Sequence, residues 1–211
     1  MAATTSTRRT HRRLNRDLIV DTAIALIERD GADALSMRRL GAELGVEAMS
    51  LYHHVPNRAE LLSAVSERML APLQAIEFDR GWREACRGFA HALRGIAVTH
   101  PATFGLVGMR PLNSPPVLRV VERLLAVLVA DGFEPRDALA VYRAVASYAR
   151  GYALAEAVGF TVDASDPHAR DRLQALSPTE FPILSGRARE LSSLDADSGF
   201  ERGLDALLVS P

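Results

Sequence analysis

The side chains best suited to chemistry lie in a short polar stretch that follows a glycine turn and precedes a proline. Their hydroxyl and imidazole groups can hydrogen-bond to phosphates and base edges, and the small apolar members can touch a thymine methyl. Only Leu51 within the stretch is strongly core-like, which is unusual for an inner packing helix. The candidate nucleic-acid contacts are Ala48, Met49, Ser50, Tyr52, His53 and His54.

Two arginines extend this surface on either side. Arg38 stands in the first turn of the helix expected before the stretch, where it can reach base edges or phosphates. Arg58 stands at the start of the helix expected after it, where backbone amide groups already favour a phosphate. Both arginines therefore join the candidate contacts.

The elements that must position these residues are two short helices separated by Gly45-Val46. Ser36 is a good N-cap for the first helix, which runs to Leu44, and residues 47–53 form the second. Such a pair meets at a steep angle, which is the geometry of a helix-turn-helix. Gly41 costs roughly 1 kcal/mol against alanine inside a helix, so we expect close approach of the next helix there. An ordinary turn in a helical bundle is the alternative.

The whole chain shows helical periodicity and no strand-type alternation of useful length, which predicts an all-α fold. We expect a basic flexible arm over residues 1–13, a three-helix helix-turn-helix domain over 14–72, and a larger helical domain over 73–211. The longest helix is expected over Pro135–Val158, and a capping box at 198–201 opens the terminal helix.

The expected arm carries positive charge ahead of an otherwise balanced chain. The formal net charge of −1 argues neither for nor against a polyanionic partner. Several arginines nevertheless precede the first acidic residue, Asp17, and such an arm can meet phosphates. A solvated terminus without a role fits the charge equally well. These arginines are Arg8, Arg9, Arg12, Arg13 and Arg16.

Composition excludes several classes of protein. The hydrophobic fraction of 48% and the charged fraction of 24% are those of a globular chain. A single cysteine, Cys86, excludes an intrachain disulfide and a multi-cysteine metal cluster. Arg83 and Arg87 on either side could lower its pKa and make it reactive, but we expect a buried helix cysteine. No apolar run approaches the ~18 residues of a membrane span, and no signal peptide is visible. We expect a cytoplasmic protein that has no membrane partner.

Catalytic and metal-binding motifs are absent from the sequence. The adjacent His53 and His54 do not share a helix face, and no carboxylate lies four residues after either, so a metal site there is not expected. No nucleophile-elbow, zinc-protease, phosphate-loop or dinucleotide pattern occurs. We therefore expect no cofactor, no metal and no enzyme activity.

The run from Arg16 to Leu70 resembles the N-terminal DNA-binding domain of the TetR family of bacterial repressors. The resemblance rests on the Leu-Ser-Met-Arg-Arg-Leu start, the Leu-Gly-Val turn, the Leu-Tyr-x-His-Val recognition helix and the Asn-Arg-x-x-Leu-Leu opening of the next helix. It implies DNA contacts at Arg38, Ala48, Met49, Ser50, Tyr52 and His54, with Arg58 on a phosphate.

The remainder resembles the C-terminal domain of the subgroup that contains the tetracycline repressor. Trp82, His100-Pro101, the Gly108–Pro111 turn, Asp131-Gly132-Phe133 and Gly151 carry this resemblance. It implies that residues 73–211 bind a ligand and form a homodimer through the long helix and the terminal helix. Burial of both helix faces in the core of one chain is the alternative. The apolar positions expected at that interface are Ala138, Val141, Tyr142, Val145, Ala149, Tyr152, Ala153, Phe200, Leu204 and Leu207.

The resemblance also implies a small-molecule inducer. The resembled repressor ligates a metal through a histidine two positions before the Gly-x-Arg-Pro turn, where this chain has Leu106. We therefore expect a largely apolar inducer rather than magnesium-bound tetracycline, with two phenols to orient it. A filled core without ligand is the alternative. The expected lining is Phe89, Leu93, Phe104, Leu106, Met109, Val145, Tyr148 and Tyr152.

These expectations describe a ligand-responsive repressor that a small molecule releases from a palindromic, double-stranded DNA operator. Two further functions stay open on the sequence alone. One is a helical ligand-binding or interaction protein that no longer binds DNA, and the other is an enzyme.

Overall fold

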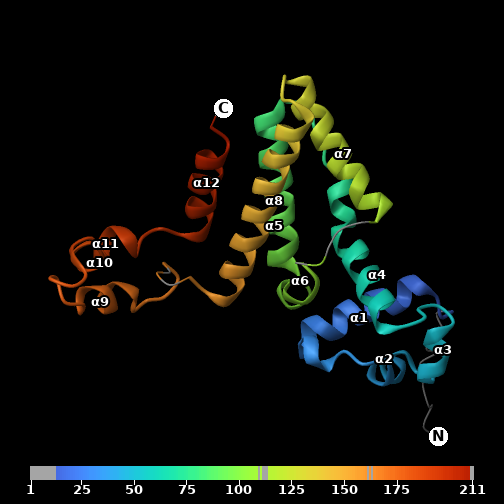
Figure 1. Cartoon of the computed structure of the whole chain (residues 1–211). Helices are drawn as coiled ribbons and strands as arrows, with labels where there is room; N and C mark the ends of the chain where they lie inside the picture. Colours follow the sequence, from blue (N-terminus) through green and yellow to red (C-terminus); the bar gives the residue numbers. More distant parts are fainter. Residues whose placement is uncertain (1–12, 109, 111–113, 161, 163, 210–211) are drawn as a thin grey trace, which may run out of the picture. The chain divides into compact units, whose positions relative to one another are not determined.

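The computed structural model describes residues 13–108, 110, 114–160, 162 and 164–209. Within these residues every regular element is a helix, which confirms the all-α class (Figure 1). The chain divides into two compact units, residues 1–65 and 66–211. The expected arm lies outside the described residues except for Arg13, which is exposed.

The first unit opens with helix α1 (Arg16–Asp30). Asn15 caps it, because its side-chain oxygen accepts a hydrogen bond from the backbone N–H of Leu18 at 2.8 Å. The apolar stripe along α1 is buried, as its helical spacing predicts. Gly31 ends the helix with a φ of 84°, a conformation that favours glycine.

Two short helices and the start of a third complete this unit. Ser36 caps α2 (Met37–Leu44), as expected, by accepting from the N–H of Arg39 at 3.2 Å. Gly45 adopts the left-handed conformation, with a φ of 70°, and releases the chain into α3 (Ala48–Tyr52). Asn57 caps α4 (Arg58–Leu70) through the N–H of Glu60 at 2.9 Å. A 3₁₀ turn, η1 (Ala32–Ala34), links α1 to α2.

The second unit is built around two long helices, α5 (Trp82–Thr99) and α8 (Pro135–Val158), which lie side by side (Figure 1). Helices α6 (Pro101–Val107) and α7 (Pro115–Ala130) pack against both. The 3₁₀ turn η2 (Ala71–Ala75) packs on α5 and α7. No described helix is both long and apolar enough to cross a membrane.

Three short helices follow α8 and pack on one another. They bury a few small or apolar side chains among themselves, such as Ala169, Leu173 and Ala188. They are α9 (Ala169–Gln174), α10 (Pro182–Gly186) and α11 (Ala188–Leu191).

The terminal helix α12 (Ala196–Leu207) packs against α8 of its own chain. Phe200 is fully buried there, with its ring 5.4 Å from that of Tyr148 and 5.2 Å from that of Tyr152. Arg94 of α5 forms a bidentate pair with Glu156 of α8, at 2.7 and 2.8 Å, and also pairs with Asp197 of α12 at 2.8 Å. A half-buried ionic cluster therefore joins three helices.

The apolar face expected at a dimer interface is largely core within one chain. Its α8 members Ala138, Val145, Ala149 and Ala153 are at most 3% exposed, because α5, α7 and α12 already surround the helix. On α12, Phe200 and Leu204 are fully buried, and only Leu207 stays exposed, at 41%. The prediction of an interface was therefore wrong for these buried positions, whereas Val141, Tyr142 and Tyr152 of the same face are half-buried.

One local expectation needs correction, and another is confirmed. The cap of α12 is Asp195, whose carboxylate accepts from the N–H of Ser198 at 2.7 Å, so the helix starts three residues before the expected box. Cys86 is fully buried, as expected for a helix cysteine, and burial raises its pKa to about 12. The thiol is therefore an inert core group.

Candidate nucleic-acid interface

Helix α3 is held against α2 by a backbone contact that only glycine permits. A Cβ atom on Gly41 would lie 2.9 Å from the carbonyl oxygen of Val46 and 3.2 Å from the nitrogen of Ala48. The N–H of Val46 donates to the carbonyl of Gly41 at 2.9 Å across the same contact. Leu40 and Leu51 are both fully buried around it. The close approach expected at Gly41 is therefore present.

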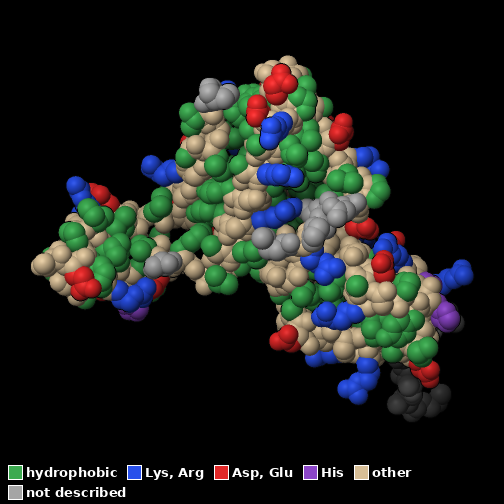
Figure 2. Space-filling view, viewed as in Figure 1, with side chains coloured by type: hydrophobic (Ala, Val, Ile, Leu, Met, Phe, Trp, Pro, Cys, Tyr) green, Lys and Arg blue, Asp and Glu red, His purple; other side chains and the backbone are tan. Residues whose placement is uncertain are grey.

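Because Leu51 points into the core, the other side chains of this segment lie at or near the surface. Tyr52 is 39% exposed and Met49 is 69% exposed, whereas Ala48 and Ser50 are half-buried. His53 and His54 follow the end of α3 and are exposed. Basic and histidine side chains can be seen at the surface of this unit in Figure 2.

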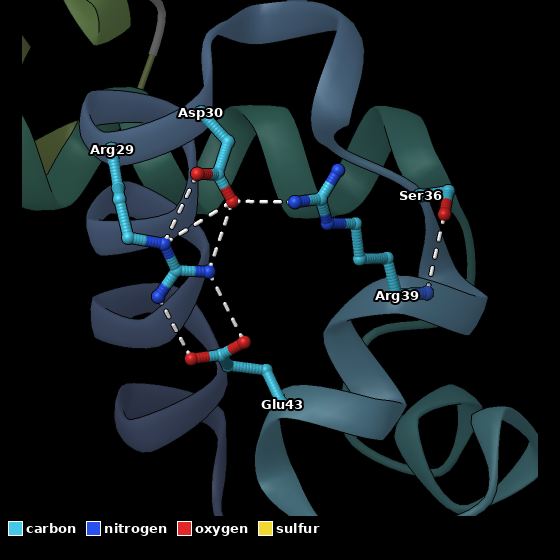
Figure 3. A network of polar contacts seen from close by, with 5 residues as sticks. All are labelled: Arg29, Asp30, Ser36, Arg39 and Glu43. Carbon is cyan, nitrogen blue, oxygen red and sulfur yellow. Dashed lines mark hydrogen bonds and ion pairs between the residues drawn. The ribbon is translucent and has the colours of Figure 1, made fainter.

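The two neighbouring arginines of α2 have different surroundings. Arg39 donates to the carboxylate of Asp30 at 2.6 Å, so its charge is used within the protein (Figure 3). Arg38 is exposed, and no described residue forms an ion pair with it. Its guanidinium is therefore available to a phosphate or a base edge.

Arg58 offers a second available cation. It is the first residue of α4, it is exposed, and no ion pair joins it to the described part of the chain. A helix N-terminus carries partial positive charge, so this position favours an anion. All eight predicted contacts thus lie within the segment from the start of α2 to the start of α4, and six of them are exposed.

The residues predicted to line a ligand pocket lie on α5, α6 and α8, apart from Met109, which is outside the described residues. Phe89, Leu93, Phe104 and Val145 are each at most 3% exposed. Leu106 is half-buried. These side chains form part of the apolar core of the second unit.

The two phenols predicted to orient a ligand form hydrogen bonds with α12. Tyr148 donates to the carbonyl of Phe200 at 3.0 Å, and Tyr152 donates to that of Ala196 at 2.8 Å. Gly199 and Gly203 face these two phenols, and a Cβ at either position would collide with them. A ligand would gain a phenol as a partner only by displacing one of these bonds.

The sequence did not predict a cavity of about 640 Å³ near the start of α5. Trp82 and Phe133 border it, with their rings 5.0 Å apart, and Asp131, Glu134 and Asp137 supply carboxylates. The Asp131 carboxylate accepts from the N–H of Trp82 at 2.6 Å, a contact across 49 residues that no local pattern indicates. None of the predicted ligand residues lines this cavity.

Among the described residues, no three His, Cys, Asp or Glu side chains are grouped closely enough to hold a metal ion. The segment from α2 to α4 instead combines exposed hydroxyl, imidazole and guanidinium groups on a compact helical support. Such groups suit recognition of DNA.

Two family models match the chain. Residues 19–65 match the "Bacterial regulatory proteins, tetR family" model, and residues 77–209 match the "Tetracyclin repressor-like, C-terminal domain" model. Together these matches cover the helix-turn-helix and most of the second unit.

Similar proteins extend over nearly the whole chain. An HTH-type transcriptional regulator of Saccharopolyspora erythraea is 32% identical over 95% of this chain and 86% of its own. The class D tetracycline repressor of Escherichia coli is 29% identical over 93% and 88%. Apo ActR of Streptomyces coelicolor has a TM-score of 0.79 at 32% identity and covers 92% of both chains; ActR is also known in complex with actinorhodin, with a TM-score of 0.78. The chain belongs to the TetR family of bacterial transcriptional regulators.

Proposed function

We propose that this regulator is a repressor that binds a palindromic DNA operator as a homodimer and leaves it when a small, largely apolar molecule binds. Residues 14–72 are the DNA-binding domain, and residues 73–211 bind the ligand and form the dimer. The exposed surface of the helix-turn-helix carries the proposal, because Arg38 of α2, Tyr52 of α3 and His54 just after α3 are all exposed there. The protein acts in the cytoplasm, without cofactor or catalytic step.

The operator follows from the symmetry of a homodimer. Two recognition helices must enter successive major grooves, roughly 34 Å apart, so two half-sites are related by a dyad. Tyr52, His53 and His54 supply hydrogen bonds to bases and phosphates, Met49 touches a thymine methyl, and Arg38 and Arg58 neutralise phosphates. Ala48 and Ser50 are half-buried and contact DNA only at close approach.

The inducer site lies in the apolar core between α5, α6 and α8. Phe89, Leu93, Phe104, Leu106 and Val145 line it, and none of these offers an oxygen or imidazole ligand to magnesium. The complex of ActR with actinorhodin supports a small-molecule ligand for this chain. Tyr148 and Tyr152 border the site and exchange their α12 partners for the ligand.

Release of DNA requires that the inducer favours a conformer of lower operator affinity. A ligand that binds both conformers equally shifts nothing, however tightly it binds. The ligand must therefore lower the affinity for DNA by the same factor by which DNA lowers the affinity for the ligand.

A gel shift with the DNA upstream of the protein's own gene tests the proposal. We expect a retarded complex that a hydrophobic compound abolishes, with saturable quenching of Trp82 fluorescence by the same compound. Because Trp82 borders the unpredicted cavity, the titration is repeated with Leu93→Glu, which must remove the quenching if the ligand lies in the proposed core site.

Three outcomes would contradict the proposal. Magnesium-dependent quenching by tetracycline would overturn the apolar inducer. Compound binding without any DNA complex would favour a ligand-binding protein that no longer recognises DNA. Conversion of the compound into a product would favour an enzyme.

A further inference from the structure

Four charged side chains form a continuous ionic network between α1 and α2 (Figure 3). Arg29 pairs with both carboxylate oxygens of Glu43, at 2.9 and 3.2 Å, and its Nη2 lies 3.0 Å from Asp30. Asp30 in turn accepts from Arg39 at 2.6 Å. The signs alternate along the network, and its net charge is zero.

The network fixes α2 at two points. Arg29 and Asp30 are the last two residues of α1, whereas Arg39 lies in the first turn of α2 and Glu43 in its last turn. Two attachments on successive turns restrain both the sliding and the rotation of a helix. A single ion pair would restrain only one point on it.

The position of α3 depends on α2. The backbone contact at Gly41 leaves no gap between the two helices, and α3 is only five residues long, too short to be stable alone. A restraint on α2 is therefore also a restraint on the recognition segment. The network itself lies at the joint between α1 and α2 and includes none of the predicted DNA contacts.

We propose that Arg29, Asp30, Arg39 and Glu43 are positioning residues that hold α2, and with it α3, in the DNA-binding orientation, and that Arg39 is not itself a DNA contact. This inference rests on the proposed function in DNA binding. It separates two adjacent arginines: Arg38 faces the nucleic acid, whereas the guanidinium of Arg39 is held by Asp30.

The electrostatic environment agrees with a formed network. Hydrogen bonds from Arg29 lower the pKa values of both Asp30 and Glu43. The side chains of Arg29 and Arg39 are about half exposed, so water and salt screen the pairs and their effect is local. The network restrains the orientation of α2 rather than deciding whether the unit folds.

Amide hydrogen exchange of the full chain without DNA tests the restraint. We expect Arg29→Ala and Glu43→Ala each to accelerate exchange of the α2 amides about two- to fivefold, and Asp30→Asn about three- to tenfold. The double variant Arg29→Ala/Glu43→Ala must exchange no faster than the faster single variant, because either substitution alone already removes the ion pair. Arg187→Ala, which removes an exposed pair in the second unit, is the control and leaves α2 unchanged.

Salt dependence of operator binding distinguishes positioning from phosphate contact. Arg38→Ala should lower the magnitude of the slope of log affinity against log salt by about 0.9, as expected when one phosphate contact is removed. Arg39→Ala should weaken binding without changing that slope. Three results would overturn the inference. The first is a reduced salt slope for Arg39→Ala. The others are accelerations of α2 exchange that multiply in the double variant, and α2 exchange equal to wild type in all variants.

The two readouts also separate this inference from the proposed function. If the wild-type protein binds no DNA, the proposed function fails, whereas the exchange experiment still reports whether the network holds α2. If the variants unfold, exchange accelerates equally in α1, and that result contradicts a restraint confined to α2. Wild-type protein at 1 M salt provides a check without substitution: its α2 exchange should approach that of Arg29→Ala.

Discussion

At the scale of single residues, Gly41 decides whether α2 and α3 can meet. Gly41→Ala should raise helix propensity but force a Cβ atom to within 2.9 Å of a carbonyl oxygen. We expect a net loss of about 1–3 kcal/mol in the stability of the first unit, because overpacking outweighs propensity. Urea unfolding followed by circular dichroism measures the loss.

Gly95→Ala is the matched control for that change. Gly95 is an exposed residue inside α5, and nothing lies within 4 Å of the Cβ that the substitution adds. This variant should be stabilised by about 0.5–1 kcal/mol. If Gly41→Ala is equally stabilising, the close contact between α2 and α3 does not exist in solution.

Residue-scale features differ in how well the sequence predicts them. The caps at Ser36 and Asn57 and the close approach at Gly41 depend on residues within a few positions, so their types and spacing reveal them. The different surroundings of Arg38 and Arg39 cannot be predicted in this way. The two residues have identical chemistry, and only the path of α1 brings Asp30 to one of them.

At the scale of elements, Arg94 ties α12 to the core of the second unit. Arg94→Ala leaves the carboxylate of Glu156, which is only 23% exposed, without its bidentate partner. We expect the free energy of unfolding of the second unit to fall by about 2–4 kcal/mol. This is less than for a fully buried pair, because Glu156 keeps some access to water. Trp82 fluorescence in urea follows this unit alone, since Trp82 is the only tryptophan.

Arg187→Ala provides the comparison for Arg94→Ala. The pair of Arg187 with Glu190 is short, at 3.1 Å, but both side chains are more than 60% exposed. Its removal should cost less than about 1 kcal/mol. Equal losses in the two variants would show that the ionic cluster around Arg94 does not stabilise the docking of α12.

The contact between α8 and α12 should also weaken at alkaline pH. Burial raises the pKa of Tyr148 to about 12, from an ordinary value of 10.0. A folded-state pKa above the unfolded value stabilises the protein fully below pH 10, and this stabilisation is lost as the pH rises through 12. Ionisation also removes the proton that Tyr148 donates to Phe200.

The urea midpoint of the second unit, measured between pH 10 and pH 12, checks this dependence. Wild type should lose stability across this range, and Tyr148→Phe should lose less. The loss that remains in the variant comes from Tyr152, because burial raises its pKa as well. A midpoint that falls by the same amount in both proteins would exclude Tyr148 as a source of the pH dependence.

The elements show what hydrophobic periodicity can and cannot reveal. It correctly predicted that one face of α8 is buried, but it could not show that α5, α7 and α12 of the same chain bury it. The start of α12 was misplaced because both Asp195 and Ser198 are good caps, and only the backbone conformation selects Asp195. The short helices α9 to α11 have too few residues for a periodic pattern.

At the scale of the whole molecule, the proposed homodimer needs a different face of α8. Small residues at Ala140, Ala144, Ser147 and Gly151 are exposed along one stripe of that helix. Ala144→Glu should place a charge in the interface and yield a monomer that binds the operator weakly. Sedimentation velocity at micromolar concentration measures the change.

Ala157→Glu is the control for the dimer test. Ala157 is exposed on the same helix, 13 residues further along and therefore about 140° around its axis from Ala144. This variant should remain dimeric. A wild-type protein that sediments as a monomer would refute the dimer, and a dimeric Ala144→Glu variant would refute this interface.

The sequence predicts which candidate DNA contacts are exposed better than it predicts whether the apolar core holds a cavity. Tyr52 and His54 stand on the polar side of a short capped motif, so they are exposed irrespective of which helices cover its apolar side. The core residues Phe89 and Val145 are buried, as expected, but apolar side chains look the same in the sequence whether they line a cavity or fill one.

The decisive measurement for the recognition of DNA by this segment is the affinity of Tyr52→Ala/His54→Ala for the natural operator. Both side chains are exposed, so the variant should fold as stably as wild type. We expect specific binding to weaken by about 1–3 kcal/mol for each base contact that the substitutions remove, while affinity for unrelated DNA stays the same. Unchanged specific binding in a variant that still folds would contradict the assignment of α3 as the recognition helix.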